Sequence, residues 1–256
     1  GPPRSTPKPS SAASDVYKRQ DQDRQWWSFQ PRKRHPVPVG PHLSARTLNP
    51  IDIFIHDRLS EHSLTISPPA SPSELLRRTF FDLWGLPPTP GATERFLAEA
   101  HPDAYSRLLD RLLASPSYGE RWGRHWLDVV RYADSAGFAN DFERPNAWRY
   151  RDYVIRAFNQ DKPYDAFVRE QIAGDLLPEP RWSADTTFNE SAIGPAHFRM
   201  VELGFVPVDA LEDQVKVVDN QIDVYSKAFL GLTASCARCH NCLLYTSDAA
   251  DEGLGV

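Results

Sequence analysis

The spacing of apolar residues predicts that this chain is built mostly of helices. In six segments, apolar side chains recur every three or four positions, the period that places them on one face of an α-helix. Alternating apolar and polar positions, which indicate strands, are scarce. We therefore predict a mainly α, irregular multi-helix domain with long loops. The helical segments are Ile51–Leu59, Tyr105–Leu112, Trp122–Ala133, Ala147–Asn159, Tyr164–Leu176 and Asp213–Leu230. In the last segment the stripe comprises Val215, Val218, Ile222, Tyr225 and Phe229.

Four residue pairs mark where helices begin. Each places a side chain that can cap a helix directly before a proline. Proline suits the first helical position because its missing N–H would be unpaired there anyway. The pairs are Asn49-Pro50, Ser71-Pro72, Thr89-Pro90 and Ser115-Pro116. Capping-box spacing is also present in two places, which are Ser71 with Glu74 and Ser117 with Glu120.

Two stretches lack helical periodicity. Residues 21–48 contain Trp26-Trp27-Ser28-Phe29-Gln30-Pro31 and several further prolines, which predicts an extended Pro-rich segment anchored by its aromatic residues. Arg181–Ala210 predicts a long loop with short elements. The chain has no glycine-rich phosphate loop and no Gly-x-Ser-x-Gly nucleophile elbow.

Both ends of the chain resemble translated sequencing adaptor. Asp15-Val16-Tyr17-Lys18-Arg19-Gln20 can be encoded by GAT GTG TAT AAG AGA CAG, and Cys242-Leu243-Leu244-Tyr245-Thr246-Ser247 by TGT CTC TTA TAC ACA TCT. Apart from its last base, the second string lies within the reverse complement of the first, as in a transposase-based adaptor. We therefore interpret residues 1–20 and 242–256 as adaptor-derived, and Asp21–Asn241 as the native part, truncated at its C-terminal end.

Setting the two ends aside leaves the charge unchanged but alters the cysteine count. Lys+Arg falls from 29 to 25 and Asp+Glu from 34 to 30, so the net charge stays at −5. This acidic balance argues against nucleic acid as a partner, because phosphate binding requires a basic surface. No apolar run approaches the roughly 20 residues that span a bilayer. Of three cysteines only Cys236 and Cys239 remain, because Cys242 lies in the adaptor.

The two remaining cysteines form the motif Cys236-Ala237-Arg238-Cys239-His240. This spacing is used for covalent attachment of c-type haem, in which two thiols bond to the haem vinyl groups and the following histidine binds the iron as proximal ligand. A redox dithiol, half of a zinc site or a chance match are the alternatives. We predict haem c as the cofactor, attached by Cys236 and Cys239 and ligated by His240.

The position of the motif bears on the second axial ligand. Small soluble cytochromes carry the motif near their start and a methionine ligand far downstream, whereas here a long helical chain precedes it. A downstream ligand would lie in the part that is cut away. The upstream candidates are His125, His197 and Met200, the only methionine, and each is also an ordinary structural residue.

One predicted helix carries weak candidates for catalysis. His125, Asp128, Arg131 and Asp134 are each three positions apart, so neighbours can touch in succession. Asp128 would then orient His125 as a base, with Asp134 as a further carboxylate. The alternative, which we favour, is a salt-bridged helix whose tryptophans build the core.

Two charged groups offer binding surfaces. Arginines mixed with aromatics could hold haem propionates or an acidic sugar, although packing of arginine stems on apolar surface is the simpler interpretation. An acidic group could bind calcium, although a solvated helix face is the simpler interpretation. The first group is Arg144, Trp148, Arg149, Tyr150, Arg151 and Asp152, and the second is Asp209, Glu212, Asp213, Asp219 and Asp223.

Many short motifs in order carry a family resemblance. They are Trp27-Ser28-Phe29-Gln30-Pro31, Asn49-Pro50-Ile51-Asp52, Gly85-Leu86-Pro87-Pro88-Thr89-Pro90, Tyr118-Gly119-Glu120-Arg121-Trp122, Arg131-Tyr132-Ala133-Asp134-Ser135, Asp161-Lys162-Pro163-Tyr164, Ala173-Gly174-Asp175-Leu176-Leu177-Pro178, Asp219-Asn220-Gln221-Ile222-Asp223 and Leu230-Gly231-Leu232-Thr233. Together they resemble the planctomycete cytochrome-c-associated domain of unknown function, over essentially all of Trp26–Asn241.

The resemblance implies an exported, periplasmic protein, with neighbouring cytochrome-c-like and uncharacterised domains as partners. It supports the haem interpretation and supplies no reaction. We therefore expect residues 49–241 to form a helical domain with an electron-transfer or haem-dependent role. The alternative function is a polysaccharide-binding or hydrolytic module, in which the cysteine motif is structural or binds another metal.

Overall fold

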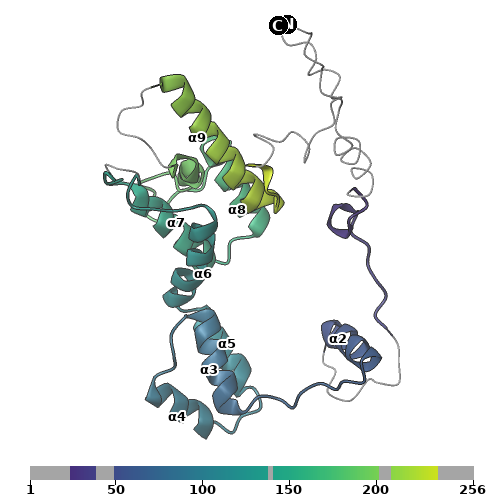
Figure 1. Ribbon diagram of the computed structural model, residues 1–256. Helices are drawn as coiled ribbons and strands as arrows, with labels where there is room; N and C mark the ends of the chain where they lie inside the picture. Colours follow the sequence, from purple (N-terminus) through teal and green to yellow (C-terminus); the bar gives the residue numbers. More distant parts are fainter. Residues whose placement is uncertain (1–23, 39–48, 138–140, 202–208, 236–256) are drawn as a thin grey trace, which may run out of the picture. The chain divides into compact units, whose positions relative to one another are not determined.

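A computed structural model describes residues 24–38, 49–137, 141–201 and 209–235 (Figure 1). These residues form helices and two isolated β-bridges, and no strand occurs among them. The predicted mainly α class is therefore confirmed. The chain divides into two units, residues 1–69 and residues 70–256.

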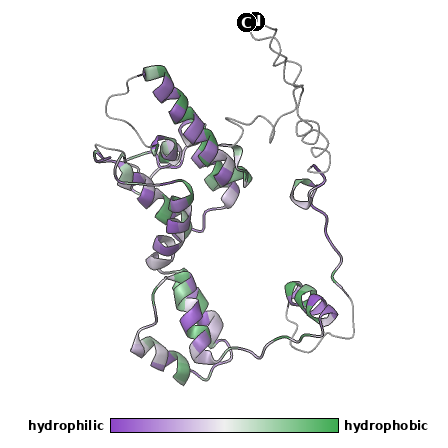
Figure 2. Ribbon diagram, in the orientation of Figure 1, coloured by the Kyte–Doolittle hydropathy of each residue, from purple (hydrophilic) through white to green (hydrophobic). Residues whose placement is uncertain are grey.

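The first unit contains a short 3-10 helix, η1 (Trp27–Phe29), and one α-helix, α2 (Pro50–Glu61). Asn49 caps α2 as predicted, because its side chain accepts a hydrogen bond from the Asp52 N–H at 3.1 Å. Neither helix has a buried residue. The aromatic residues expected to anchor this segment are exposed, as are Ile51, Phe54 and Ile55 of α2. Figure 2 shows apolar and polar residues interspersed along this helix.

In the second unit, three helices surround a small core. They are α3 (Pro72–Leu83), α4 (Pro90–Ala98) and α5 (Ala104–Leu113). The predicted capping box of α3 is present, since Ser71 and Glu74 each accept from the other's backbone N–H. The core consists of Leu76, Phe80, Ala92, Leu108 and Leu112.

A larger core lies among the elements that follow. These are α6 (Pro116–Val129), α7 (Ala147–Asn159), α8 (Tyr164–Ala173), η2 (Gly174–Leu176), η3 (Ser191–Arg199), α9 (Ala210–Tyr225) and η4 (Ser226–Leu230), a turn of π-helix. The buried residues are Val130, Ala147, Tyr150, Tyr153, Val154, Ala157, Phe167, Met200 and Val224.

Helix α6 contacts elements of both cores. The Trp122 indole N–H donates to the Asp82 carbonyl of α3 at 3.1 Å. One turn later, the Trp126 indole N–H donates to the Tyr150 hydroxyl of α7 at 3.0 Å. Two tryptophans four residues apart on one helix therefore form hydrogen bonds to helices of different cores, α3 and α7.

Element η3 lies against α8 and η2 with almost no space between the backbones. A Cβ placed on Gly194 would overlap the Glu170 carbonyl, and one on Gly174 would overlap the Ser191 carbonyl. Glycine is required at both positions because any side chain would displace the backbone of the neighbouring segment. The predicted long loop at 181–210 thus contains η3, whose backbone packs closely against its neighbours.

Three sequence predictions need correction. Helix α6 ends at Val129 rather than at residue 133, because Arg131 has a positive φ of 53°. Ser115 is the cap of α6, so the second capping box, at Ser117, does not form. On α9, Val215, Val218 and Ile222 are exposed, and it is Val224 that is buried.

Candidate functional site

The end of helix α6 separates the predicted catalytic residues. His125 and Asp128 lie exposed on α6, and no hydrogen bond joins them within the described ranges. Asp134 lies beyond the helix end, where it accepts a hydrogen bond from the Tyr132 hydroxyl. Burial and that carboxylate raise the pKa of Tyr132. The structure therefore does not bring the three candidates together as a relay.

Arg131 ends α6 in a conformation usually taken by glycine. The Tyr132 N–H donates to the Leu127 carbonyl at 2.9 Å, across the residue in the left-handed conformation, as in a Schellman motif. A non-glycine residue there costs on the order of 1 kcal/mol. The observed contacts of the Arg131 side chain offset this cost.

The Arg131 guanidinium connects three elements. Its Nε donates to Asn220 of α9 at 2.5 Å, and its Nη1 donates to the carbonyl of His197 in η3 at 3.2 Å. Burial, together with the nearby charge of Arg144, lowers the pKa of Arg131 to about 10. The guanidinium therefore ties the end of α6 to η3 and α9.

Asp223 lies on α9 near this guanidinium. Its carboxylate accepts a hydrogen bond from the Lys227 ammonium at 2.6 Å. That bond lowers the pKa of Asp223, and the neighbouring Ser235 side chain lowers it further. Ser235 directly precedes Cys236 in the sequence. The last described residue before the motif therefore lies next to Asp223.

His197 is buried completely in η3. Its Nδ1 lies 3.1 Å from the Gly194 carbonyl oxygen, while its Nε2 is buried without a hydrogen-bond partner among the described residues. The ring packs against Phe198, with 4.2 Å between centroids, and lies 6.1 Å from Phe229. Burial lowers the pKa of His197 to about 4, so the imidazole is neutral at pH 7.

This neutral histidine predicts a loss of stability in acid. The pKa of His197 is 6.5 in its ordinary state and about 4 when folded, so only the unfolded chain takes up the proton between these values. The contribution of the neutral His197 to the free energy of unfolding is therefore complete above pH 6.5. It falls by about 3 kcal/mol as the pH is lowered to 4. Urea unfolding at pH 7 and pH 4.5 measures it. His197→Asn, which can still donate to Gly194 but does not titrate, should reduce the difference; an unchanged difference would contradict the assignment.

Two other candidates lie close to η3. Met200 is buried directly after η3, and its sulfur lies 4.0 Å from Nη1 of Arg144. The same guanidinium donates to the Val201 carbonyl. The Arg144 side chain therefore bonds to Met200 and Val201, directly after η3. These contacts explain its position as part of the packing.

The other charged groups have partners of their own. Arg149 lies over the Trp148 ring at 4.7 Å, and Arg151 forms an ion pair with Asp152 at 2.9 Å. In the acidic group, Asp209 caps α9. Within the described part of the chain, no cluster of three or more His, Cys, Asp or Glu residues could hold a metal ion.

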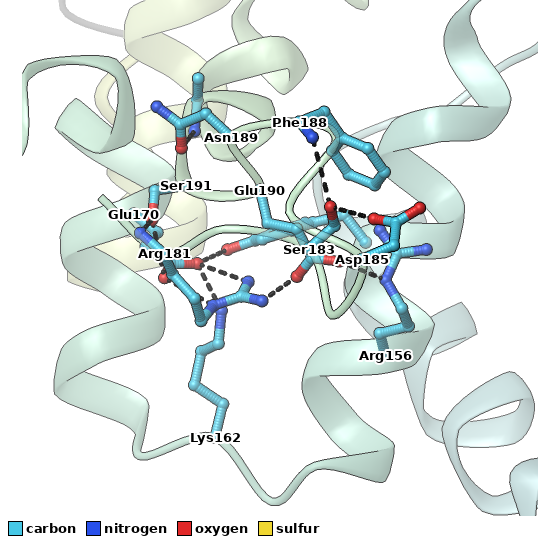
Figure 3. Close-up of polar contacts among 12 residues, drawn as sticks. Arg156, Lys162, Glu170, Arg181, Ser183, Asp185, Phe188, Asn189, Glu190 and Ser191 are labelled. Atoms are coloured by element: carbon cyan, nitrogen blue, oxygen red, sulfur yellow. Dashed lines mark hydrogen bonds and ion pairs between the residues drawn. The ribbon is translucent and has the colours of Figure 1, made fainter.

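A buried ion network joins α7, α8 and the loop that precedes η3 (Figure 3). Glu170 of α8 accepts hydrogen bonds from Lys162, Arg181 and Tyr153, the last at 2.8 Å. Glu190 accepts from Arg181 and from Arg156. Both carboxylates are almost fully buried. Sequence reasoning missed this network because its bonded partners are eight or more positions apart and follow no helical period.

Burial and pairing have opposite effects on Glu170. Burial alone would raise the pKa of its carboxyl, but the hydrogen bonds from Arg181 and Lys162 outweigh this effect and lower the pKa to about 2. Lys162, whose pKa burial lowers, also lies 4.8 Å from the Tyr153 ring centroid. Glu170 is therefore ionised at neutral pH, and the ion pairs of the network hold the loop in place.

An aromatic pocket of about 220 Å³ lies beside this network, between α6, the end of α7 and the start of α8. Its lining is mostly apolar, with Asp161 as its carboxylate. Asp161 has a positive φ of 47° in the turn after α7. Such a pocket can hold a small ring or an apolar group. The lining residues are Tyr118, Trp126, Ala157, Phe158, Asp161, Lys162, Tyr164 and Phe167.

The predicted cofactor ligands Cys236, Cys239 and His240 lie outside the described residues. Their roles, and the interpretation of residues 1–20 and 242–256 as adaptor, stay predictions. Among the described residues, no helix is both long and apolar enough to cross a membrane.

Comparison with known proteins identifies one family. The family PSCyt2, described as a protein of unknown function (DUF1549), matches residues 50–249. The match includes the whole cysteine motif and runs past Asn241. No curated protein and no solved structure matches the chain.

Proposed function

The chain belongs to the PSCyt2 family of unknown function (DUF1549), and we propose that it is a c-type haem-binding domain of an exported, periplasmic multidomain protein with an electron-transfer or haem-dependent role. The observation that carries this proposal is the spacing Cys236-x-x-Cys239-His240. Cys236 and Cys239 would attach the haem covalently, and His240 would be the proximal ligand. The haem, when bound, supplies one-electron transfer. Cytochrome-c-like and uncharacterised domains of the intact protein are its proposed partners.

The described residues before the motif support this proposal. Helix α9 passes into η4, and π-helical turns are frequent at functional sites. The chain then turns at Gly231, whose φ of 64° suits glycine, and the Leu232 N–H donates back to the Ser226 carbonyl at 3.0 Å. Asp223 lies beside Ser235. The segment that leads to Cys236 is therefore held against α9 and η4.

Two buried side chains of the described residues carry atoms of the kinds that bind haem iron. His197 carries a buried ring nitrogen without a partner in the described part of the chain, and Met200 carries a buried thioether. Both types of atom bind haem iron.

The test is covalent haem attachment. Expression with a periplasmic c-haem maturation system should give a protein whose pyridine haemochrome band survives denaturation and extraction. The Cys236→Ser/Cys239→Ser variant should lose the band. Cys242→Ser is the matched control, because it also removes a thiol but lies outside the motif, and it should keep the band. A colourless, helical protein, or a band that persists in the double variant, would overturn the proposal.

A second candidate function rests on the aromatic pocket. Aromatic rings with one carboxylate at hand are also suited to a sugar ring, so a polysaccharide-binding module is the alternative. Measurements on one protein preparation distinguish the two functions. A haem domain is coloured, whereas a sugar-binding domain is colourless and its tryptophan fluorescence changes with added oligosaccharide, and Trp126→Phe should reduce that change.

A further inference from the structure

We propose that the aromatic pocket between α6, the end of α7 and the start of α8 binds a small organic cation that carries a methylated ammonium group. Such a site is independent of the haem proposal, and it gives the pocket a ligand other than a sugar ring. The angles between the rings, the hydrogen bonds already made by the polar side chains and the charge of Asp161 support it.

The pocket is small and mainly aromatic. Five of the eight described residues that line its volume of about 220 Å³ are Trp, Phe or Tyr. Pockets for drug-sized ligands hold roughly 300–1,000 Å³, so this one suits a small molecule or the end group of a larger one. The face of an aromatic ring is electron-rich and attracts a cation, and several such rings together recognise methylated ammonium groups.

Three rings of the pocket stand at large angles to one another. The centroids of Trp126 and Phe167 lie 4.9 Å apart, with 76° between the ring planes. Phe158 is inclined at 59° to Phe167. Rings in this arrangement form the walls of a cage, in which a compact, rounded group can contact more than one ring. A sugar ring, in contrast, stacks on a flat aromatic platform.

The polar side chains of the lining already have partners. The Trp126 indole N–H donates to the Tyr150 hydroxyl at 3.0 Å. The Lys162 ammonium bonds to Glu170 and lies 4.8 Å from the Tyr153 ring centroid, so it belongs to the buried ion network (Figure 3). A sugar would exchange hydrogen bonds with water for few in the pocket, which is unfavourable. A methylated ammonium group donates none and loses none.

Asp161 supplies a negative charge at the pocket. Its side chain is exposed and forms no hydrogen bond or ion pair with a residue in the described ranges. Lys162, the cation of the lining, is already paired with Glu170. The carboxylate of Asp161 is therefore available to a bound cation, and it would repel an anion.

The turn after α7 holds Asp161 in place. The Asp161 N–H donates to the Phe158 carbonyl at 3.1 Å, and the Lys162 N–H donates to the Ala157 carbonyl at 3.0 Å. This is the Schellman pattern at a helix end, and Asp161, with a φ of 47°, occupies the position where glycine or asparagine is usual. Asp161→Asn therefore removes the charge while keeping a residue that suits the turn.

The experiment is a titration of the full chain with choline, followed by the saturation-transfer NMR signal of the choline methyl protons. The matched probe is 3,3-dimethylbutan-1-ol, which has the same shape as choline but no charge. We expect choline to bind roughly three- to thirtyfold more tightly than the alcohol, because the alcohol lacks the attraction between a cation and the rings.

Two positions of the lining are suited to substitution. Tyr164, the first residue of α8, is 64 % exposed, so changing it leaves the core intact. Tyr164→Leu removes a ring and Asp161→Asn removes the charge, and each should weaken choline binding roughly two- to fivefold. Tyr164→Phe keeps the ring and should bind choline as the parent does. Circular dichroism verifies that each variant is folded.

Three results would overturn the cation site. They are equal affinities for choline and the alcohol, an affinity for choline that Tyr164→Leu or Asp161→Asn leaves unchanged, and binding of an oligosaccharide by a protein that does not bind choline. The last result would assign the pocket to a sugar. Since the titration needs no haem, its outcome is separate from that of the haem proposal.

Discussion

Replacing Gly194 by alanine is expected to lower the free energy of unfolding by roughly 3–5 kcal/mol. The added Cβ would overlap the backbone carbonyl of Glu170, and no flexible side chain can move aside to make room. The backbones of η3 and α8 must separate, which also disturbs His197 and Glu170. Urea unfolding followed by helical circular dichroism measures the change.

Gly91→Ala is the matched control. Gly91 lies in the first turn of α4, and the nearest atom to an added Cβ would be the end of the flexible Arg95 side chain, at 3.5 Å. Alanine there should leave stability unchanged or raise it by about 0.5–1 kcal/mol, because glycine has more freedom in the unfolded chain. Equal effects at positions 91 and 194 would show that the close approach of η3 to α8 is not what makes Gly194 necessary.

Replacing Glu170 by glutamine is expected to lower the free energy of unfolding by about 3–5 kcal/mol. The substitution keeps the shape of the side chain but removes the charge that balances Lys162 and Arg181 in a buried site. Glu190 is then the one carboxylate left in the network. The loss is a large fraction of the stability of an ordinary domain.

The pH dependence of the parent protein should show the same interaction. The folded pKa of Glu170 is about 2, below its ordinary 4.5, so its contribution is complete above pH 4.5 and is lost as the pH falls toward 2. Asp165→Asn provides the control, because it removes an exposed ion pair with Arg169 and should cost less than about 0.5 kcal/mol. A Glu170→Gln effect no larger than this would contradict a structural role for the network.

Local rules explain what could be predicted from the sequence. Asn49, Ser71, Thr89 and Ser115 all cap helices as expected, because a cap depends on residues within three positions of it. The range of α7 is also as predicted, at Ala147–Asn159. Helix existence and helix starts are therefore encoded locally in this chain.

What could not be predicted depends on distant contacts. Arg131 ends α6 without a glycine because Asn220 and His197 hold its side chain, and no window around residue 131 contains them. The outward orientation of Val215 on α9 has a similar origin: that helix faces the core with Val224 and the polar Asn220. Periodicity identifies a helical stripe, but not whether the stripe is the face that becomes buried.

The hydrogen bonds of α6 to both α3 and α7 link the stability of the two cores in the second unit. The region that contains α3, α4 and α5, residues 70–113, is at the size where a single small core seldom supports an independent fold. Trp122 connects that core to a helix whose other half is packed in the larger core through Trp126. We therefore expect the two cores to unfold together, with the amide protons of α3 protected from exchange only while α6 is folded.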